Sequence, residues 1–391
     1  NDIAYCPLVL SYAIVYNNSV ELFADIRKFS DDIINLLAEN QVKIYPYEDI
    51  YRKVSEMTSE DKLLLDSAIM NYSLYQAISK ETVIVDKQNP EILMKSVKNE
   101  TQAENLRKAH LKDAVAHTKF MYWLKKNIGR VEITELSASA RLEGLRAEQE
   151  HFLGPSFGPI SAYGEHGAIV HYSADEKSNV PLKEGKLFMT DTGGHYLEGS
   201  TDITRTVALG EVGNIEKEHF TLVARAMLRL ANTVFLYGCS GANLDCIARE
   251  VFWKEGLNFN HGTGHGVGYL LNIHEGPINF RWKEGERPAP ALEENMVITD
   301  EPGIYIEGSH GIRLENELLV RKTVKNEYGQ FMNFEILTYV PIDLDAILPE
   351  KMSTEEKEML NHYHKQVYEK VSPYLSEEER IWLKEYTRAV K

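Results

Sequence analysis

Cysteine is scarce in this chain, with three residues in 391. Cys6, Cys239 and Cys246 cannot all pair within the chain, and their spacing is not that of a metal site. Unpaired thiols are typical of proteins in reducing compartments. We therefore expect buried or half-buried thiols and a cytoplasmic location.

Long apolar runs are missing as well. No run approaches the 18 residues of a membrane-spanning helix, and the first residues lack the pattern of a signal peptide. The sequence therefore predicts no membrane segment. The chain starts at Asn1 without a Met and enters strand-like sequence almost at once, which we interpret as a cut chain.

Positive charge is also in short supply: 43 Lys and Arg stand against 59 Asp and Glu, for a net charge of −16 at pH 7. Binding to phosphates needs a basic patch, and none is visible, so nucleic acid and anionic membranes are disfavoured as partners. The chain is 43% hydrophobic and 26% charged, as is ordinary for a globular protein. Its length suffices for two or three domains.

Five acid and imidazole side chains lie inside apolar or glycine-rich stretches: Asp191, Asp202, His265, Glu301 and Glu315. A single acid in such a chain is most often a solvated surface group. A buried set of unpaired acids would be costly through desolvation, and bound cations would remove that cost. Carboxylate oxygens with one imidazole suit a pair of divalent cations.

The surrounding sequence predicts strands next to these side chains. We expect a hairpin that turns at Gly193-Gly194 and carries Asp191 on one arm and Asp202 on the other. Around His265, the sequence His-Gly-Thr-Gly-His-Gly-Val-Gly has four glycines, which let the backbone and the imidazoles approach an ion closely. The two glutamates each follow a short apolar run, as expected at the end of a strand.

This ordered set resembles that of the pita-bread metallopeptidases, which include methionine aminopeptidase, prolidase and aminopeptidase P. Three segments look most like the large, eukaryotic-type aminopeptidase P: Ala168–Tyr172, His261–Gly268 and Asn272–Pro277. The resemblance covers roughly residues 1–391 and is most specific between 165 and 320. Creatinase shares the fold without the metals, so the presence of all five ligands argues against a creatinase-like protein.

The resemblance implies a function and two metal ions. It implies an aminopeptidase that releases the first residue of peptides with proline in second position, using two divalent ions that we expect to be Mn²⁺, with Zn²⁺ or Co²⁺ as alternatives. Asp191 would bind one ion, Asp202 and Glu315 would bridge both, and His265 with Glu301 would complete the other shell. A hydroxide held between the ions would attack the scissile carbonyl, and Glu301 would take the proton of the water.

A second group of residues is expected around the ions. His274 would donate to the oxyanion, His171 would move protons or hold substrate, and His261 would line the proline pocket. Arg313 and Tyr305 are expected to support the carboxylates, and Arg313 is also expected to help bind the substrate. Weaker candidates are Arg205, next to these motifs, and Tyr172, which is more simply explained by packing.

Three alternatives remain open. The ligand spacing alone equally permits a methionine aminopeptidase or a prolidase-like dipeptidase. A non-catalytic pita-bread binding module is less favoured, because such relatives have lost metal ligands that this chain keeps.

The expected fold class is α+β. The chain would comprise a creatinase-type N-terminal α/β domain (1–96), a pita-bread catalytic domain (97–341) and a C-terminal helical extension (342–391). Large aminopeptidase P enzymes have one more N-terminal domain, which we interpret as absent here. Expected segments are strands at 8–15 and 82–85, an amphipathic segment at 60–70, and helices at 101–128, from about 134, and at 215–237, 244–253, 353–364 and 376–386.

The C-terminal helices carry aromatic side chains that the sequence suggests are exposed: Tyr363, Tyr368, Tyr374 and Trp382. Large enzymes of the resembled family commonly dimerise through this region, so we expect a homodimer. The alternative is that these rings pack on the catalytic domain.

Overall fold

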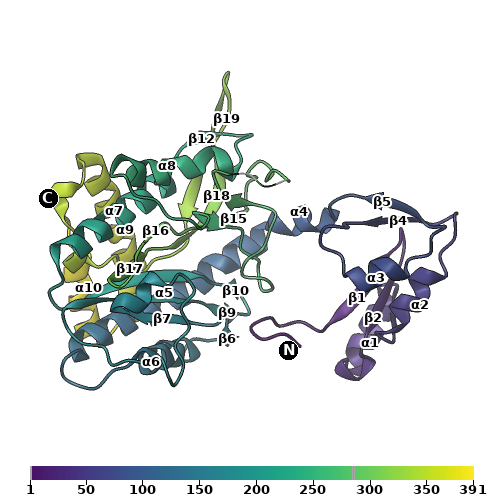
Figure 1. The fold of residues 1–391 in the computed structure, drawn as a ribbon, viewed down its shortest axis with the longest axis horizontal. Helices are drawn as coiled ribbons and strands as arrows, with labels where there is room; N and C mark the ends of the chain where they lie inside the picture. The colour runs from purple at the N-terminus through teal and green to yellow at the C-terminus, as the bar shows by residue number, and fades with distance from the viewer. Residues whose placement is uncertain (1, 284, 286) are drawn as a thin grey trace. The chain divides into compact units, whose positions relative to one another are not determined.

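The computed structural model describes residues 2–283, 285 and 287–391, and its contacts divide the chain into two compact units, Asn1–Met94 and Lys95–Lys391 (Figure 1). Residues 342–391, predicted from the sequence to be an extension, belong to the second unit. In the part of the chain that the structure describes, no helix is both long enough and apolar enough to cross a membrane.

The first unit is an α/β unit with two small sheets. Antiparallel β1 and β2 are joined by β3, which is parallel to β2, while β4 and β5 form a parallel pair. The amphipathic segment expected at 60–70 is β4 followed by turns; its apolar residues Leu63–Leu65 pair with β5 in the sheet. The elements are β1 (Ser11–Val15), β2 (Val20–Ala24), α1 (Asp31–Glu39), β3 (Val42–Tyr45), α2 (Asp49–Ser55), β4 (Lys62–Leu65), α3 (Tyr72–Ala77), β5 (Val83–Asp86) and α4 (Pro90–Ser96), whose last residues enter the second unit.

Two helices open the second unit, α5 (Glu100–Asn127) and α6 (Glu135–Ala147). The helix predicted at 101–128 is present; it begins at Glu100, and Asn99 and Gln102 form its capping box. Asn99 accepts from the Gln102 backbone N–H at 2.9 Å and donates its own backbone N–H to the Gln102 side chain at 3.0 Å. Because the asparagine cap satisfies the first free N–H groups, the helix begins one residue before the predicted position.

The acid-bearing segment is more elaborate than the single hairpin that we expected. β8 (Lys186–Thr192) pairs antiparallel with β11 (Ile203–Leu209) and with β7 (Ile160–Tyr163). The predicted turn at Gly193-Gly194 is wrong: Gly194 begins β9 (Gly194–Tyr196), which pairs with β10 (Gly199–Ser200) and with β6 (Phe152–Pro155), so the chain reverses at 197–198. Gly193 is needed for close packing, because a Cβ there would overlap the carbonyl oxygen of Thr201.

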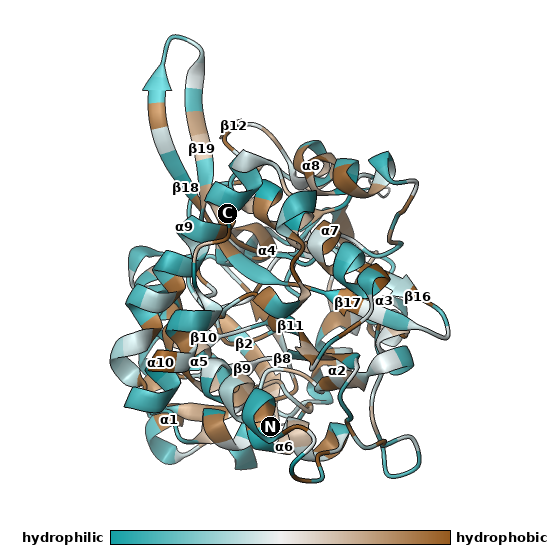
Figure 2. Cartoon of the chain, turned by 90° about the vertical axis from the view of Figure 1, so that its left-hand side faces the viewer, coloured by the Kyte–Doolittle hydropathy of each residue, from teal (hydrophilic) through white to brown (hydrophobic). Residues whose placement is uncertain are grey.

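The second half of this unit repeats the pattern of helices followed by an antiparallel sheet. Two helices, α7 (Asn214–Ala231) and α8 (Gly241–Lys254), precede a four-stranded sheet of order β12-β19-β18-β15. The expected helix at 215–237 is shorter, because residues 235–236 form strand β12. The strands are β12 (Phe235–Leu236), β13 (Gly264–His265), β14 (Asn279–Phe280), β15 (Val297–Asp300), β16 (Gly303–Ile306), β17 (His310–Arg313), β18 (Asn316–Asn326) and β19 (Gly329–Ile336). β18 and β19 extend as a hairpin with a largely hydrophilic end (Figure 2).

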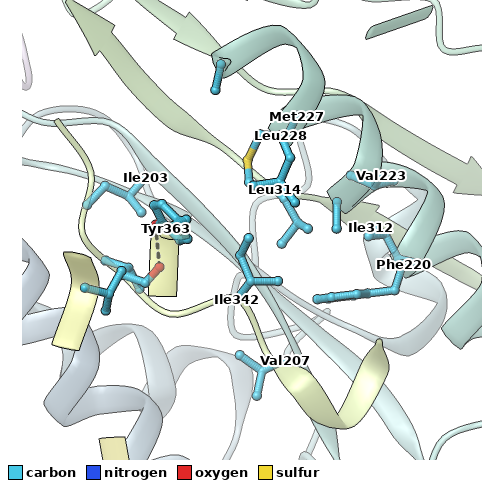
Figure 3. Close-up of a cluster of buried hydrophobic side chains, with 14 of the residues drawn as sticks. Ile203, Val207, Phe220, Val223, Met227, Leu228, Ile312, Leu314, Ile342 and Tyr363 are labelled. Atoms are coloured by element: carbon cyan, nitrogen blue, oxygen red, sulfur yellow. Dashed lines mark hydrogen bonds between the residues drawn. The ribbon is translucent and has the colours of Figure 1, made fainter. Parts of the chain in front are cut away.

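One large apolar cluster joins the two halves of the second unit. Phe220, Val223 and Met227 of α7 pack with Ile203 and Val207 of β11 and with strand β17 (Figure 3). Burial of such side chains contributes roughly 1.5–3 kcal/mol each. The rigid core thereby fixes the strands whose ends carry the acids.

The C-terminal helices α9 (Thr354–Val371) and α10 (Glu377–Tyr386) pack on this core. Tyr363 was wrongly expected to be exposed: it is 1% exposed, and its hydroxyl donates to the Val340 carbonyl at 2.6 Å (Figure 3). Tyr368 and Trp382 are partly buried against the core, whereas Tyr374 is 57% exposed. These rings mainly serve packing, because their helices cover apolar surface.

The three cysteines carry free thiols. Cys6 is buried and Cys239 is half-buried, in agreement with the sequence analysis. Cys246 is exposed, which corrects that expectation; it lies on α8, whose other face packs against the core.

Candidate metal centre

The five predicted ligands converge on one cavity of about 580 Å³ in the second unit. Ligand atoms of Asp191, Asp202 and Glu315 lie within 4.8 Å of one another, and so do those of His265, Glu301 and Glu315. Glu315 belongs to both groups. The arrangement therefore offers two adjacent sets of three ligands that share a carboxylate.

Each ligand is held at or near the end of a strand. Asp191 lies on β8, Asp202 directly precedes β11, and His265 ends β13. Glu301 follows β15 and Glu315 lies between β17 and β18. The expectation that acids follow short apolar strands is therefore confirmed for both glutamates.

The acids lie too close together to be stable as anions without a bound cation. Burial raises the pKa of Asp202 well above its ordinary value, and the charges of Asp191 and Glu301 raise it further. Burial and the neighbouring Asp202 likewise raise the pKa of Glu315, and burial raises that of Glu301. Asp191 Oδ1 is buried and has no hydrogen-bond partner among the described residues. Divalent cations would satisfy these oxygens and offset their repulsion, so the residues present fit a metal centre.

His265 presents a free nitrogen lone pair to the acids. Its Nδ1 lies 3.0 Å from the carbonyl oxygen of Gly266, which can only accept, so Nδ1 carries the proton. Nε2 then points its lone pair toward Asp202 Oδ2 at 3.6 Å and Glu301 Oε1 at 3.7 Å. This tautomer is the one that a metal ligand requires.

Arg313 and Tyr305 link an acid to a second histidine. The Arg313 guanidinium forms a short ion pair with Asp191 and donates to the Tyr305 hydroxyl at 2.8 Å. Tyr305 lies 2.9 Å from His261 Nε2, and burial lowers the pKa of His261 to about 4. His261 Nδ1 faces the Gly262 carbonyl at 2.7 Å, so Nε2 accepts from the tyrosine. The neutral imidazole is thus held in one orientation.

Several residues that position the ligands were not predicted from the sequence. Thr204 donates its hydroxyl to Glu315 Oε2 at 2.7 Å, and the backbone N–H of Asp202 donates to Glu317 Oε1 at 2.6 Å. His110 of α5 lies 3.2 Å from the other oxygen of Glu317. These partners lie far from the ligands in sequence, and the signal available was a run of threonines and acids beside the motifs.

Arg205 was a weak candidate and proves to be a structural hub. It is fully buried, and its guanidinium donates to the Val340 carbonyl at 2.8 Å, to Asn316 Oδ1 at 2.8 Å and to the Tyr363 hydroxyl at 2.7 Å. It does not line the cavity. It therefore ties β11 to the segment after Glu315 and to α9.

The remaining predicted residues line the cavity in different ways. His274 lies with its ring centroid 4.4 Å from that of His265, and burial with the nearby His265 lowers its pKa to about 4. One of its nitrogens is within 4.8 Å of ligand atoms of Asp202 and His265, so it is close enough to bind an ion itself. His171 is exposed at the cavity. Tyr172 is buried and donates to Glu135 Oε2 at 2.9 Å, as the packing explanation requires.

Comparison with known proteins identifies similar sequences over the whole chain. The profile of metallopeptidase family M24 matches residues 104–322, that of the creatinase/prolidase N-terminal domain matches 1–102, and that of the C-terminal region of peptidase M24 matches 330–390. A probable Xaa-Pro aminopeptidase P of Paracoccidioides brasiliensis is 34% identical over 100% of this chain, and Xaa-Pro aminopeptidase 2 of Sus scrofa is 36% identical over 99%.

A solved structure is similar as well. The X-prolyl aminopeptidase of Caenorhabditis elegans, described as a cytosolic enzyme with a di-nuclear active site, aligns with 100% of this chain at a TM-score of 0.92 and 32% identity. The chain spans 66% and 58% of the length of the fungal and porcine relatives and 65% of the nematode protein.

Proposed function

Because the chain belongs to metallopeptidase family M24 and has its pita-bread fold, we propose that it is an aminopeptidase that removes the first residue of peptides with proline in second position. The observation that carries the proposal is the cluster of three buried carboxylates, one half-buried carboxylate and one oriented imidazole around a single cavity. The similarity to Xaa-Pro aminopeptidases supports the choice of substrate. The supporting relatives are longer than this chain.

Two divalent cations, which we propose to be Mn²⁺, would be held by Asp191, Asp202, His265, Glu301 and Glu315. When bound, such ions supply a water of lowered pKa and positive charge for the carbonyl oxygen. The half-buried Glu301, whose Oε1 lies 3.4 Å from the Thr299 hydroxyl, would accept a proton from the attacking water and pass it to the leaving nitrogen.

The histidines around the cavity have separate tasks in this proposal. His274 donates to the developing oxyanion, and His171, exposed at the cavity, holds substrate or moves protons. His261, held neutral by burial, offers an uncharged ring surface to proline. Arg313 keeps Asp191 aimed into the cavity through their ion pair.

The deciding experiment compares cleavage of Arg-Pro-Pro with that of Arg-Ala-Pro by the chain supplied with Mn²⁺. We expect release of free arginine from the first peptide alone, because the imino acid fits a pocket that an alanine does not fill. The dipeptide Ala-Pro tests the alternative of a prolidase-like dipeptidase. Preferential cleavage of Ala-Pro, or equal cleavage of the two tripeptides, contradicts the proposal.

Location and assembly complete the proposal. We infer a cytoplasmic enzyme, supported by the free thiols and by the description of the nematode relative as cytosolic. We also propose a homodimer, with peptides as the only other partners.

A further inference from the structure

Arg281 lines the cavity of the metal centre without a role in the catalysis proposed above. Two arginines line this cavity. Arg313 is buried and already engages Asp191 and Tyr305, whereas Arg281 is exposed. Within the described ranges, Arg281 has no hydrogen bond or ion pair, so its charge is free to meet a ligand.

The backbone on both sides of Arg281 is firmly anchored. Phe280 is fully buried and pairs with Gly264 of β13, beside the proposed ligand His265. The backbone N–H of Trp282 donates to Asp245 Oδ2 at 2.8 Å, and its ring packs edge-on against Trp253 with centroids 5.6 Å apart. A residue held between two such anchors presents its side chain from a fixed position.

Asp245 also forms a buried ion pair with Arg249, and this pair fixes the position of Arg281 relative to the proposed proline pocket. Arg249 Nε donates to Asp245 Oδ2 at 2.6 Å, and the guanidinium of Arg249 also donates to the backbone carbonyl of His261 at 2.7 Å. Asp245 and Arg249 are both fully buried. The strand end before Trp282 and the segment carrying His261 are therefore tied to one rigid point.

Gly262 gives the Arg281 side chain its path along the cavity wall. A Cβ on Gly262 would lie 3.0 Å from both Cγ and Nε of Arg281, which is tighter than ordinary contact. Both residues line the cavity. The guanidinium therefore lies next to the segment of His261 and on the side expected to receive proline.

We propose that Arg281 is a specificity-determining residue that binds a carboxylate of the substrate on the C-terminal side of proline; this inference rests on the proposed function. With the proline of the substrate beside His261, the residues that follow it would lie along the wall that carries Gly262 and Arg281. A planar guanidinium matches a carboxylate in geometry and charge. The carboxylate comes from the C-terminus of a short peptide or from an acidic side chain.

The test uses two pairs of peptides that differ only in charge, with the chain supplied with Mn²⁺. Ala-Pro-Ala is compared with its C-terminal amide, and Ala-Pro-Glu-Ala amide with Ala-Pro-Gln-Ala amide. We expect Arg281→Ala to lower kcat/KM about fivefold, through KM, for the member with the extra carboxylate in at least one pair, and to leave Ala-Pro-Ala amide and Ala-Pro-Gln-Ala amide unchanged. The first pair reports a terminal carboxylate and the second an acidic side chain.

Lys283→Ala is the matched control, because it removes a positive charge only two residues from Arg281. The Lys283 side chain lies over the Trp282 ring and does not line the cavity. It should leave all four peptides unchanged. An equal effect of both variants, or an Arg281→Ala variant that treats charged and uncharged peptides alike, overturns the proposal.

Calorimetric binding of the dipeptide Pro-Ala and of Pro-Ala amide separates this proposal from the proposed function. Tighter binding of the free acid, lost in Arg281→Ala and kept in Lys283→Ala, supports the role of Arg281 even if no peptide is cleaved. Equal binding of acid and amide by the unchanged chain speaks against it even if Ala-Pro-Ala is hydrolysed.

Discussion

Asp202 lies within reach of each proposed ion, since its ligand atoms group with Asp191 and Glu315 and also with His265. Asp202→Asn removes one negative charge from this shared position while keeping the shape of the side chain. We expect loss of at least one metal ion and a fall in turnover of several orders of magnitude, with the fold intact. Metal analysis of the purified variant, alongside the surface variant Asp175→Asn, checks this. Full metal content with near-normal turnover would refute a shared ligand.

His274 has two possible tasks, and one substitution separates them. As an oxyanion donor, its replacement in His274→Ala leaves both ions in place and lowers turnover by about 10²–10³. As a ligand, which its nearness to Asp202 and His265 permits, the same change removes metal. We expect the first outcome. Metal content and turnover should be measured together, with His265→Ala as the variant that does lose metal.

At the scale of single residues, local sequence was a good guide to ligand identity but not to the groups that hold the ligands. Glu301 and Glu315 could be found because each follows an apolar strand. Glu317 and His110 could not, because their contact joins positions 207 residues apart (317 − 110) and leaves no local pattern. Local patterns report the burial of a residue and not its partner.

The short hairpin between Asp191 and Asp202 depends on Gly193 as an element of packing. Gly193→Ala places a methyl group against the carbonyl of Thr201, so the two acid-bearing segments must separate. We expect the free energy of unfolding to fall by about 3 kcal/mol and metal binding to weaken, although no ligand is changed. Gly144→Ala is the matched control, because a methyl group at that site on α6 meets open space. This change should raise the free energy of unfolding by about 0.5–1 kcal/mol, since alanine is favoured over glycine inside a helix. Chemical denaturation of both variants measures the difference.

Helix α9 carries a histidine that resists protonation. His364 is fully buried and accepts the backbone N–H of Ile342 at 3.1 Å, and burial followed by the charge of Arg205 lowers its pKa to about 3. In the unfolded chain its pKa is near the ordinary value of about 6.5, so below that pH only the unfolded state takes up the proton. The contribution of neutral His364 to the free energy of unfolding is therefore complete above pH 6.5. As the pH falls from 6.5 toward the folded pKa, the free energy of unfolding decreases by about 1.4 kcal/mol per pH unit.

Replacement of this ring should remove that contribution. His364→Gln keeps an acceptor for Ile342 and has no titrating group, so its melting temperature should fall less steeply than that of the unchanged chain between pH 6.5 and 4.5. His362→Gln, on the same helix and exposed, should behave like the unchanged chain. Parallel slopes for all three proteins would show that His364 does not contribute.

The element boundaries show where sequence patterns fail. The predicted long helix was found within two residues of its true start, because its apolar face is regular. The turn at Gly193-Gly194 was wrong, because a glycine pair signals a turn and close strand packing equally well. The exposure of Tyr363 was misjudged, because the segment that covers it, around Val340, belongs to another part of the chain.

The assembly state is a prediction about the whole molecule. We expect light scattering to give a dimer for the chain and a monomer for a form that ends near Asp343. Burial of Tyr363 makes α9 part of the core, so that truncation also risks the fold. The single change Tyr374→Ser, at the exposed ring, avoids this risk. A monomeric unchanged chain contradicts the dimer, and an unchanged dimer in both altered forms excludes the C-terminal region as its interface.

The five proposed ligands span 124 positions, from Asp191 to Glu315 (315 − 191), with helices α7 and α8 between the first two and the last three. On the ribosome, the unit ending at Met94 has its own core and is able to fold while the rest is being made. Neither set of three ligands is complete until Glu315 has emerged, because that glutamate belongs to both sets. Metal loading is therefore a late event in biosynthesis. Asp191 and Asp202 are synthesised well before Glu315 and remain without ions until it has emerged.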